Sequence, residues 1–172
     1  MFVRKFTAND FQAIADIYNQ SITDGTRTMD GHLFSADDIA QLTAKFCDRE
    51  IILVGEQDGH MVGWGIIKRY SDRLGYRVCC ETSIYLSLAE TGQGYGSILQ
   101  ASLLKQVAEF GYHHVVAKIL ASNPKSVEFH QRFGFEIVGV QKEIGYRQGR
   151  WHDMVILQYI LPEVAPFCPE LG

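Results

Sequence analysis

The first half of the chain mixes helical and strand-like spacing of apolar residues. Over residues 8–22 the apolar positions recur every three or four residues, which predicts a helix with one buried face. Ser35, followed by acidic positions, predicts the start of a second helix that runs to about Phe46. Asp58-Gly59 is typical of a tight hairpin turn between two strands. Shorter apolar runs predict strands at residues 3–6, 51–56, 61–69 and 77–86.

The second half alternates helices with strands. An apolar stripe over residues 97–110 predicts a helix that Gly111 ends. Asn123-Pro124 predicts another helix, to about residues 133–134, because asparagine caps a helix start and proline fits its first turn. Strands are predicted at residues 113–120, 135–144 and 151–161. This order of elements predicts a mixed α/β (α+β) fold built around one central sheet.

Size and charge narrow the class of protein. The chain has 172 residues, 47% of them hydrophobic, which predicts a single domain of residues 1–172, with a core at about 2–161 and a C-terminal tail at 162–172. A net charge of −4 without a basic block argues against nucleic acid as a partner. No apolar run approaches the length of a membrane span and no signal-peptide core is present, so we expect no membrane partner and a cytoplasmic location.

The cysteines and histidines show no metal-binding spacing. Cys47, Cys79, Cys80 and Cys168 form no C-x-x-C pair, so neither disulfides nor a zinc site is expected. His113-His114 makes no ligand pattern with other residues. The sequence therefore predicts a protein without a metal, in a reducing compartment.

The glycine-rich segment from Thr91 to Gly96 lies between a strand-like run and a helix. Backbone N–H groups and the helix dipole at such a place favour an anion, and glycines let a phosphate approach closely. The segment is no Walker loop, because Ser97 rather than lysine follows Gly96, and it lacks the third glycine of a dinucleotide fingerprint. By itself it predicts either a phosphate site or a glycine-rich connection without a ligand.

Several separated segments carry a family resemblance. They are residues 17–19 with Thr26 and Thr28, residues 81–86, the glycine-rich segment, residues 123–135, residues 145–147 and residues 149–153. Over about residues 2–161 the chain resembles the GNAT acetyltransferases. Most of that superfamily has tyrosine where this chain has His130, and histidine there resembles the phosphinothricin acetyltransferase-like branch. The resemblance implies a GNAT-like acyl-CoA N-acyltransferase fold with acetyl-CoA as co-substrate and no metal.

The resemblance also implies where acetyl-CoA binds. The glycine-rich segment would cradle its pyrophosphate, and the amide-rich pantetheine arm would pair with the strand backbone at Ile84 and Leu86. Thr91 departs from the family, which usually has glutamine or arginine there, so one phosphate contact is expected to be missing. The implied cofactor-binding residues are Ile84, Tyr85, Leu86, Thr91, Gly92, Gln93, Gly94, Tyr95, Gly96, Ser97, Asn123 and Ser126.

Glu81 and His130 are the candidate catalytic residues. Glu81 shares a strand face with Cys79, Ser83 and Tyr85 if no bulge intervenes. By resemblance Glu81 is a general base for the substrate amine, directly or through water; the alternative is a solvated or ion-paired strand residue. His130 is a candidate proton donor to the departing thiolate, and the alternative is a packed, hydrogen-bonded core histidine.

The candidate substrate-binding residues are Tyr146, Arg147, Trp151 and His152. Tyr146 and Arg147 are expected in the loop between the last two strands. The Arg147 guanidinium matches a substrate carboxylate bidentately, and the alternative is an exposed loop arginine. Trp151 and His152 form either a substrate wall or a structural feature of the last strand, where a tryptophan is more often part of the core.

The resulting hypothesis is an N-acetyltransferase that acts on a small amino-acid-like amine of the phosphinothricin, methionine sulfone or methionine sulfoximine type. One alternative is a GNAT enzyme for another amine, such as a polyamine, an aminoglycoside or a protein N-terminus. The other is a non-catalytic acyl-CoA-binding sensor, which only Thr91 supports. The resemblance also suggests a homodimer, with the late strands near its interface.

Overall fold

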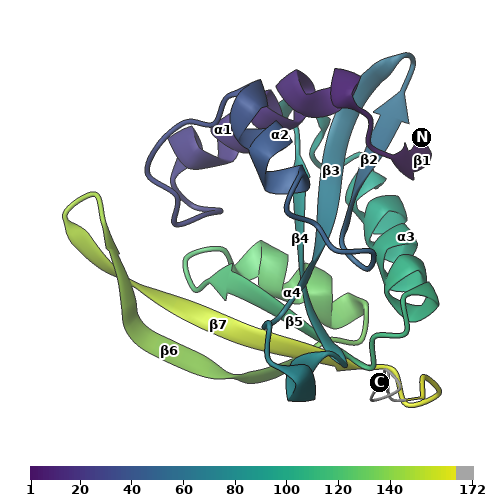
Figure 1. Cartoon of the computed structure of the whole chain (residues 1–172). Helices are drawn as coiled ribbons and strands as arrows, with labels where there is room; N and C mark the ends of the chain where they lie inside the picture. The colour runs from purple at the N-terminus through teal and green to yellow at the C-terminus, as the bar shows by residue number, and fades with distance from the viewer. Residues whose placement is uncertain (166–172) are drawn as a thin grey trace.

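One mixed sheet runs through the computed structural model, which describes residues 1–165 (Figure 1). Its strands lie in the order β1-β2-β3-β4-β5-β7-β6, which confirms the predicted mixed α/β architecture. They are β1 (Phe2–Lys5), β2 (Ile51–Gln57), β3 (His60–Arg69), β4 (Cys79–Leu86), β5 (His114–Leu120), β6 (Glu136–Arg147) and β7 (Arg150–Ile160). Cys168 and most of the predicted tail lie outside the described residues.

Helices cover both faces of the sheet, as Figure 1 shows. They are α1 (Phe11–Asp24), α2 (Ala36–Thr43), α3 (Tyr95–Glu109) and α4 (Pro124–Arg132). On one face, Ile14 of α1 and Ile39 of α2 are buried against β2 and β3. On the other face, Leu99 and Leu103 of α3 are fully buried in a second cluster that α4 also joins. The sheet is therefore held between two hydrophobic cores.

Several predicted boundaries differ from the structure by one to three residues. Helix α3 starts at Tyr95 rather than Ser97, because Gly94 takes the left-handed conformation (φ 83°) that lets the chain turn directly into the helix. Strand β4 starts at Cys79, two residues later than predicted, because a 3₁₀ turn occupies the preceding segment. Helix α2 stops at Thr43, three residues before its predicted end.

Strands β6 and β7 form a longer hairpin than predicted. Gln148 and Gly149 both have positive φ (52° and 75°), as in the two-residue turns that join twisted strands. Pairing therefore continues to Arg147 and Arg150 at the hairpin tip. The expectation that Tyr146 and Arg147 lie in a loop is wrong, since both belong to β6. In Figure 1 this yellow-green hairpin reaches away from the rest of the molecule.

Strands β4 and β5 are parallel neighbours that pair over only three residues. The paired positions are Cys79 with His114, Cys80 with Val115 and Glu81 with Val116. Beyond them β5 pairs only with β7, on its other side. The edge of β4 from Thr82 to Leu86 therefore has no strand partner on the side of β5.

The described part of the chain offers few other chemical features. Within residues 1–165 no helix has the length and apolar character needed to span a membrane. Over the same range no group of three or more His, Cys, Asp or Glu side chains is placed to hold a metal ion. Cys47, Cys79 and Cys80 are free thiols, and burial raises the pKa of Cys79 to about 11, which keeps this thiol protonated at neutral pH.

Candidate active site

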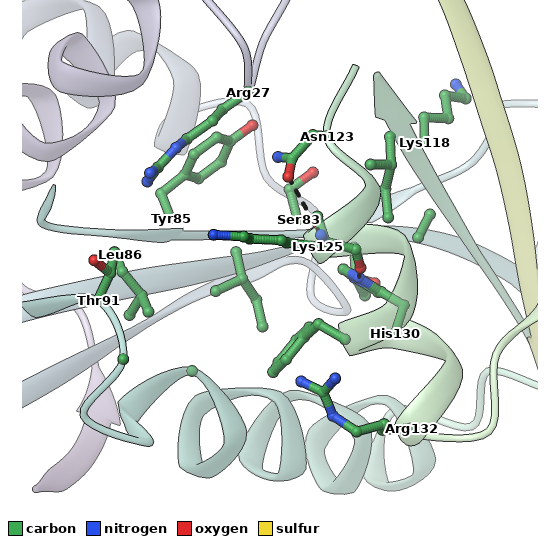
Figure 2. Close-up of a pocket in the computed structure, with 18 residues that line it drawn as sticks. Arg27, Ser83, Tyr85, Leu86, Thr91, Lys118, Asn123, Lys125, His130 and Arg132 are labelled. Atoms are coloured by element: carbon green, nitrogen blue, oxygen red, sulfur yellow. Dashed lines mark hydrogen bonds between the residues drawn. The ribbon is translucent and has the colours of Figure 1, made fainter. Parts of the chain in front are cut away.

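A cleft of about 540 Å³ opens where β4 and β5 separate (Figure 2). It is bounded by the two strands, the start of α3 and the helix α4. The predicted site residues that line it are Ile84, Tyr85, Leu86, Thr91, Gly92, Gly96, Asn123, Ser126 and His130. The predicted residues Glu81, Gln93, Gly94, Tyr95 and Ser97 do not line it. Segments far apart in the sequence thus meet at one place.

The edge of β4 fits an extended, amide-rich ligand. Between Thr82 and Leu86 the backbone groups that point away from β3 have no strand partner, so such a ligand can add to the sheet as a further strand. The hydroxyl of Thr82, a buried residue that lines the cleft, has no hydrogen-bond partner in the described chain. An orphaned buried hydroxyl is expected where a polar ligand or water completes the site.

The cleft is cationic although the chain as a whole is acidic. Arg27, Lys118, Lys125 and Arg132 line it, and within residues 1–165 no carboxylate does, whereas the net charge of the chain is −4. Figure 2 shows Lys125 extended along the cleft from α4. Such a concentration of positive charge favours a polyanionic ligand, such as one that carries phosphates.

The glycine-rich segment borders the cleft through Thr91, Gly92 and Gly96. Gly92 and Gly94 have positive φ (84° and 83°), and a Cβ at either would meet nothing within 4 Å, so the backbone is open to a ligand. The first turn of α3 follows directly and offers N–H groups to an anion. Thr91 lines the cleft, but its hydroxyl donates to the Leu88 carbonyl oxygen at 2.9 Å. Its side chain therefore supports the turn.

Glu81 lies at the point where β4 and β5 last pair. The β3–β4 register shows no shift over this stretch, which confirms that Glu81 shares a face with Ser83 and Tyr85. One carboxylate oxygen of Glu81 lies 2.7 Å from Nζ of Lys118, which lines the cleft. The other, Oε1, accepts no hydrogen bond in the described part of the chain. Glu81 is thus an ion-paired strand residue, as one of the two interpretations of the sequence expected, and its second carboxylate oxygen is open to a further donor.

His130 is packed into the α4 wall of the cleft. Its Nδ1–H donates to the Ser126 carbonyl oxygen at 2.8 Å, and its ring contacts Phe129 and Phe135 edge-on. Burial lowers the pKa of His130, which favours the neutral ring at pH 7. A neutral ring that donates through Nδ1 has its lone pair on Nε2. This placement fits the alternative that His130 is a packed, hydrogen-bonded core histidine and not a proton donor.

A cluster of hydroxyl groups lies on the α1 side of the sheet. The Tyr18 hydroxyl donates to Asp30, and a 2.9 Å hydrogen bond joins it to the Thr28 hydroxyl. Burial raises the pKa of Tyr18, so this hydroxyl stays protonated. Its ring packs edge-on against Tyr85, which lines the cleft. The segment after α1 is thereby fixed over the cleft.

The four candidate substrate residues lie on the late hairpin and none lines the cleft. Arg147 donates to the carbonyl oxygens of Ile22 (2.6 Å) and Thr28 (2.9 Å), so its guanidinium ties the hairpin to the end of α1. Trp151 is 60% exposed, so the expectation of a core tryptophan is wrong, and it packs against Tyr146. His152 is buried and donates from Nε2 to the Arg147 carbonyl oxygen at 3.2 Å.

The sequence interpretation missed all four basic residues of the cleft: Arg27, Lys118, Lys125 and Arg132. The face on which Lys118 lies could be predicted, because side chains alternate along a strand and Lys118 therefore shares a face with Val116 and Leu120. The closeness of Lys118 to Glu81 depends on the parallel pairing of β4 with β5, which the sequence of neither strand predicts. Arg27 lies in a loop, where no periodic pattern in the sequence predicts which way a side chain points.

Comparisons with known proteins agree with this geometry. The family model of the acetyltransferase (GNAT) domain matches residues 3–156. The L-amino acid N-acyltransferase MnaT of Escherichia coli is 29% identical over 164 residues, which cover 95% of each chain. A phosphinothricin acetyltransferase from Sinorhizobium meliloti, solved in complex with AcCoA, has a TM-score of 0.91 at 28% identity, covering 99% of this chain and 94% of that one. A ribosomal-protein-alanine N-acetyltransferase from Brucella melitensis has a TM-score of 0.90 at 30% identity, covering 94% and 100%.

Proposed function

Because this chain belongs to the GNAT acetyltransferase family, we propose that it transfers the acetyl group of acetyl-CoA to the α-amine of a small amino-acid-like substrate. Phosphinothricin, methionine sulfone and methionine sulfoximine represent that substrate class. The chain is an acetyl-CoA-dependent N-acetyltransferase at the level of its family. The identity of the acceptor amine and the role of each side chain are the proposed parts.

One observation carries the proposal: a carboxylate stands at the end of a cationic cleft whose wall is an unpaired strand edge. The edge of β4 from Thr82 to Leu86 and the glycines at Gly92 and Gly94 suit the pantetheine arm and the pyrophosphate of CoA. Lys125 and Arg132 supply positive charge along the same path.

The reaction needs a proton to leave the amine before attack. When bound, acetyl-CoA supplies an electrophilic thioester carbonyl and a thiolate leaving group. Glu81 is proposed to take the proton from the substrate ammonium, directly or through a water molecule, on its oxygen Oε1, which is open to a donor. Burial lowers the pKa of His130 and favours its neutral ring, so the catalytic proposal rests on Glu81, and His130 is assigned to the wall of the cleft.

The late hairpin supports a proposed homodimer. Strands β6 and β7 expose several large apolar side chains, and a contiguous exposed apolar patch is typical of a protein–protein contact. The exposed side chains are Val138, Val140, Ile144, Tyr146 and Trp151. A second copy that packs there would cover these side chains. Light scattering at two protein concentrations tests this, and a monomeric mass at both would contradict it. We also propose a cytoplasmic location, in keeping with the free thiols.

A panel of amines with a free-thiol readout tests the substrate class. Phosphinothricin, methionine sulfone and methionine sulfoximine are expected to release CoA thiol from acetyl-CoA. Spermidine, an aminoglycoside and a peptide with N-terminal alanine form the opposing arm, the last because of the similarity to the Brucella protein. Turnover in the opposing arm alone would contradict the amino-acid proposal. Tight CoA binding by calorimetry without turnover of any amine would instead identify a sensor.

A further inference from the structure

We infer that Lys118 forms a carboxylate-binding subsite, so that the Glu81–Lys118 pair recognises both charges of an α-amino acid. This inference rests on the proposed function and deepens it. Lys118 comes from β5 and lines the cleft, and its Nζ lies 2.7 Å from Oε2 of Glu81 on β4. The pair sits where the two strands part, at the end of the unpaired β4 edge.

The pair is open to a ligand. The side chains of Glu81 and Lys118 are 22% and 42% exposed, so neither charge is sealed inside the protein. An ammonium group has three donors, and Glu81 uses one of them. The centroid of the Tyr70 ring lies 5.8 Å from Nζ of Lys118. Figure 2 shows Lys118 on the same side of the strands as Arg27, away from His130 and Arg132.

The charges of the pair match those of a zwitterion. An α-amino acid carries an ammonium and a carboxylate on one carbon atom, and Glu81 and Lys118 present the opposite charges side by side. Oε1 of Glu81 is open to the substrate ammonium, and the remaining donors of Lys118 are open to the substrate carboxylate. The amine that must lose a proton is thereby placed at the base. A substrate without a carboxylate would make no ionic contact with Lys118, whose ammonium group would then interact with Glu81 alone.

Arg27 also lines the cleft on this side of the sheet, and it fits the subsite less well. Its Nε lies 3.5 Å from the carboxylate of Asp24, at the end of α1, and not beside Glu81. In Figure 2 it lies beside Tyr85 and toward the Leu86 end of the cleft. Glu81 and Tyr85 are four residues apart on an extended strand, roughly 13 Å, which is too far for one α-carbon to bridge.

Calorimetry on the CoA-bound protein tests the subsite with two probes. Methionine sulfone is compared with methylsulfonylpropylamine, the same molecule without its carboxylate. We expect the wild-type protein to bind the amino acid about tenfold more tightly or better. Lys118→Met should remove this preference while Lys118→Arg retains it. Lys105→Met, an exposed ion-paired lysine outside the cleft, is the matched control and should behave as wild type.

The outcomes separate this inference from the proposed function. A preference that persists in Lys118→Met, or no preference in the wild-type protein, would overturn the role of Lys118 even if acetyl transfer is observed. A preference lost only in Lys118→Met supports the subsite, even if acetyl-CoA releases no thiol and the proposed function fails. Thermal unfolding of each variant shows whether it is folded, and Lys118→Gln, which also removes the charge, supplies the test if Lys118→Met is not folded.

Discussion

Replacement of Gly63 by alanine should displace the strand edge that forms the cleft. A Cβ at Gly63 would lie 2.5 Å from Leu86 Cδ2 and 2.7 Å from the Tyr85 carbonyl oxygen. The leucine methyl group can rotate away, but the carbonyl belongs to the β4 backbone and moves only if the strand moves. Overpacking of this kind costs about 1–3 kcal/mol, which lowers Tm by roughly 3–10 °C in a chain of this length.

The same displacement should weaken acetyl-CoA binding, because Tyr85 and Leu86 line the cleft. Thermal unfolding and calorimetry with acetyl-CoA measure the two effects on one preparation. Gly139→Ala is the matched control, since a Cβ at this strand position meets nothing within 4 Å. The reasoning is refuted if Gly63→Ala keeps the Tm and the acetyl-CoA Kd of the wild-type protein.

Three further predictions concern stability and the late hairpin. The Arg4 guanidinium lowers the pKa of Asp10 from 3.8 to about 2, so Arg4→Met should cost up to about 2 kcal/mol at pH 7. Because a lowered acid pKa stabilises the fold only above the unfolded value, urea unfolding should show this cost shrinking as pH falls from about 4 toward 2; an equal cost at pH 2 would contradict the assignment. Gln100 is fully buried and its amide has no partner in the described chain, so Gln100→Leu should raise Tm by a few °C, roughly 2–4 °C, and a lower Tm would reveal a hidden partner. Arg147→Met removes two hydrogen bonds to the end of α1, so it should raise the KM of the amine and leave the acetyl-CoA Kd unchanged, whereas a weakened Kd would place Arg147 in the cofactor site.

Local patterns were sufficient for most of the fold. The helix that Asn123-Pro124 begins is present, with the Asn123 side chain accepting from the Ser126 N–H as a cap should. The turn at Asp58-Gly59 is present as well, with positive φ at both residues. These features depend on backbone conformations that are determined by a few neighbouring residues, so they can be predicted from the local sequence.

The cleft itself depends on contacts between distant segments. The pairing of β4 with β5 ends after Glu81 because the strands diverge, and no residue in either strand marks that point. Lys118 meets Glu81 across this junction although the two lie 37 positions apart in the chain. Arg147 shows the same limit, since an arginine near a turn predicts exposure and only the packing of the hairpin on α1 brings it to the Ile22 and Thr28 carbonyl groups.

The central claim is that acetyl transfer takes place at Glu81, beside the acetyl-CoA cleft. Steady-state kinetics of Glu81→Gln with methionine sulfone, together with the acetyl-CoA Kd of the same variant, test it most directly. The variant should fold, because it loses only a partly exposed ion pair with Lys118. We predict a kcat lower by about 100-fold or more, the usual contribution of a general base, with the Kd changed less than about twofold. A kcat equal to that of the wild-type protein would contradict the account.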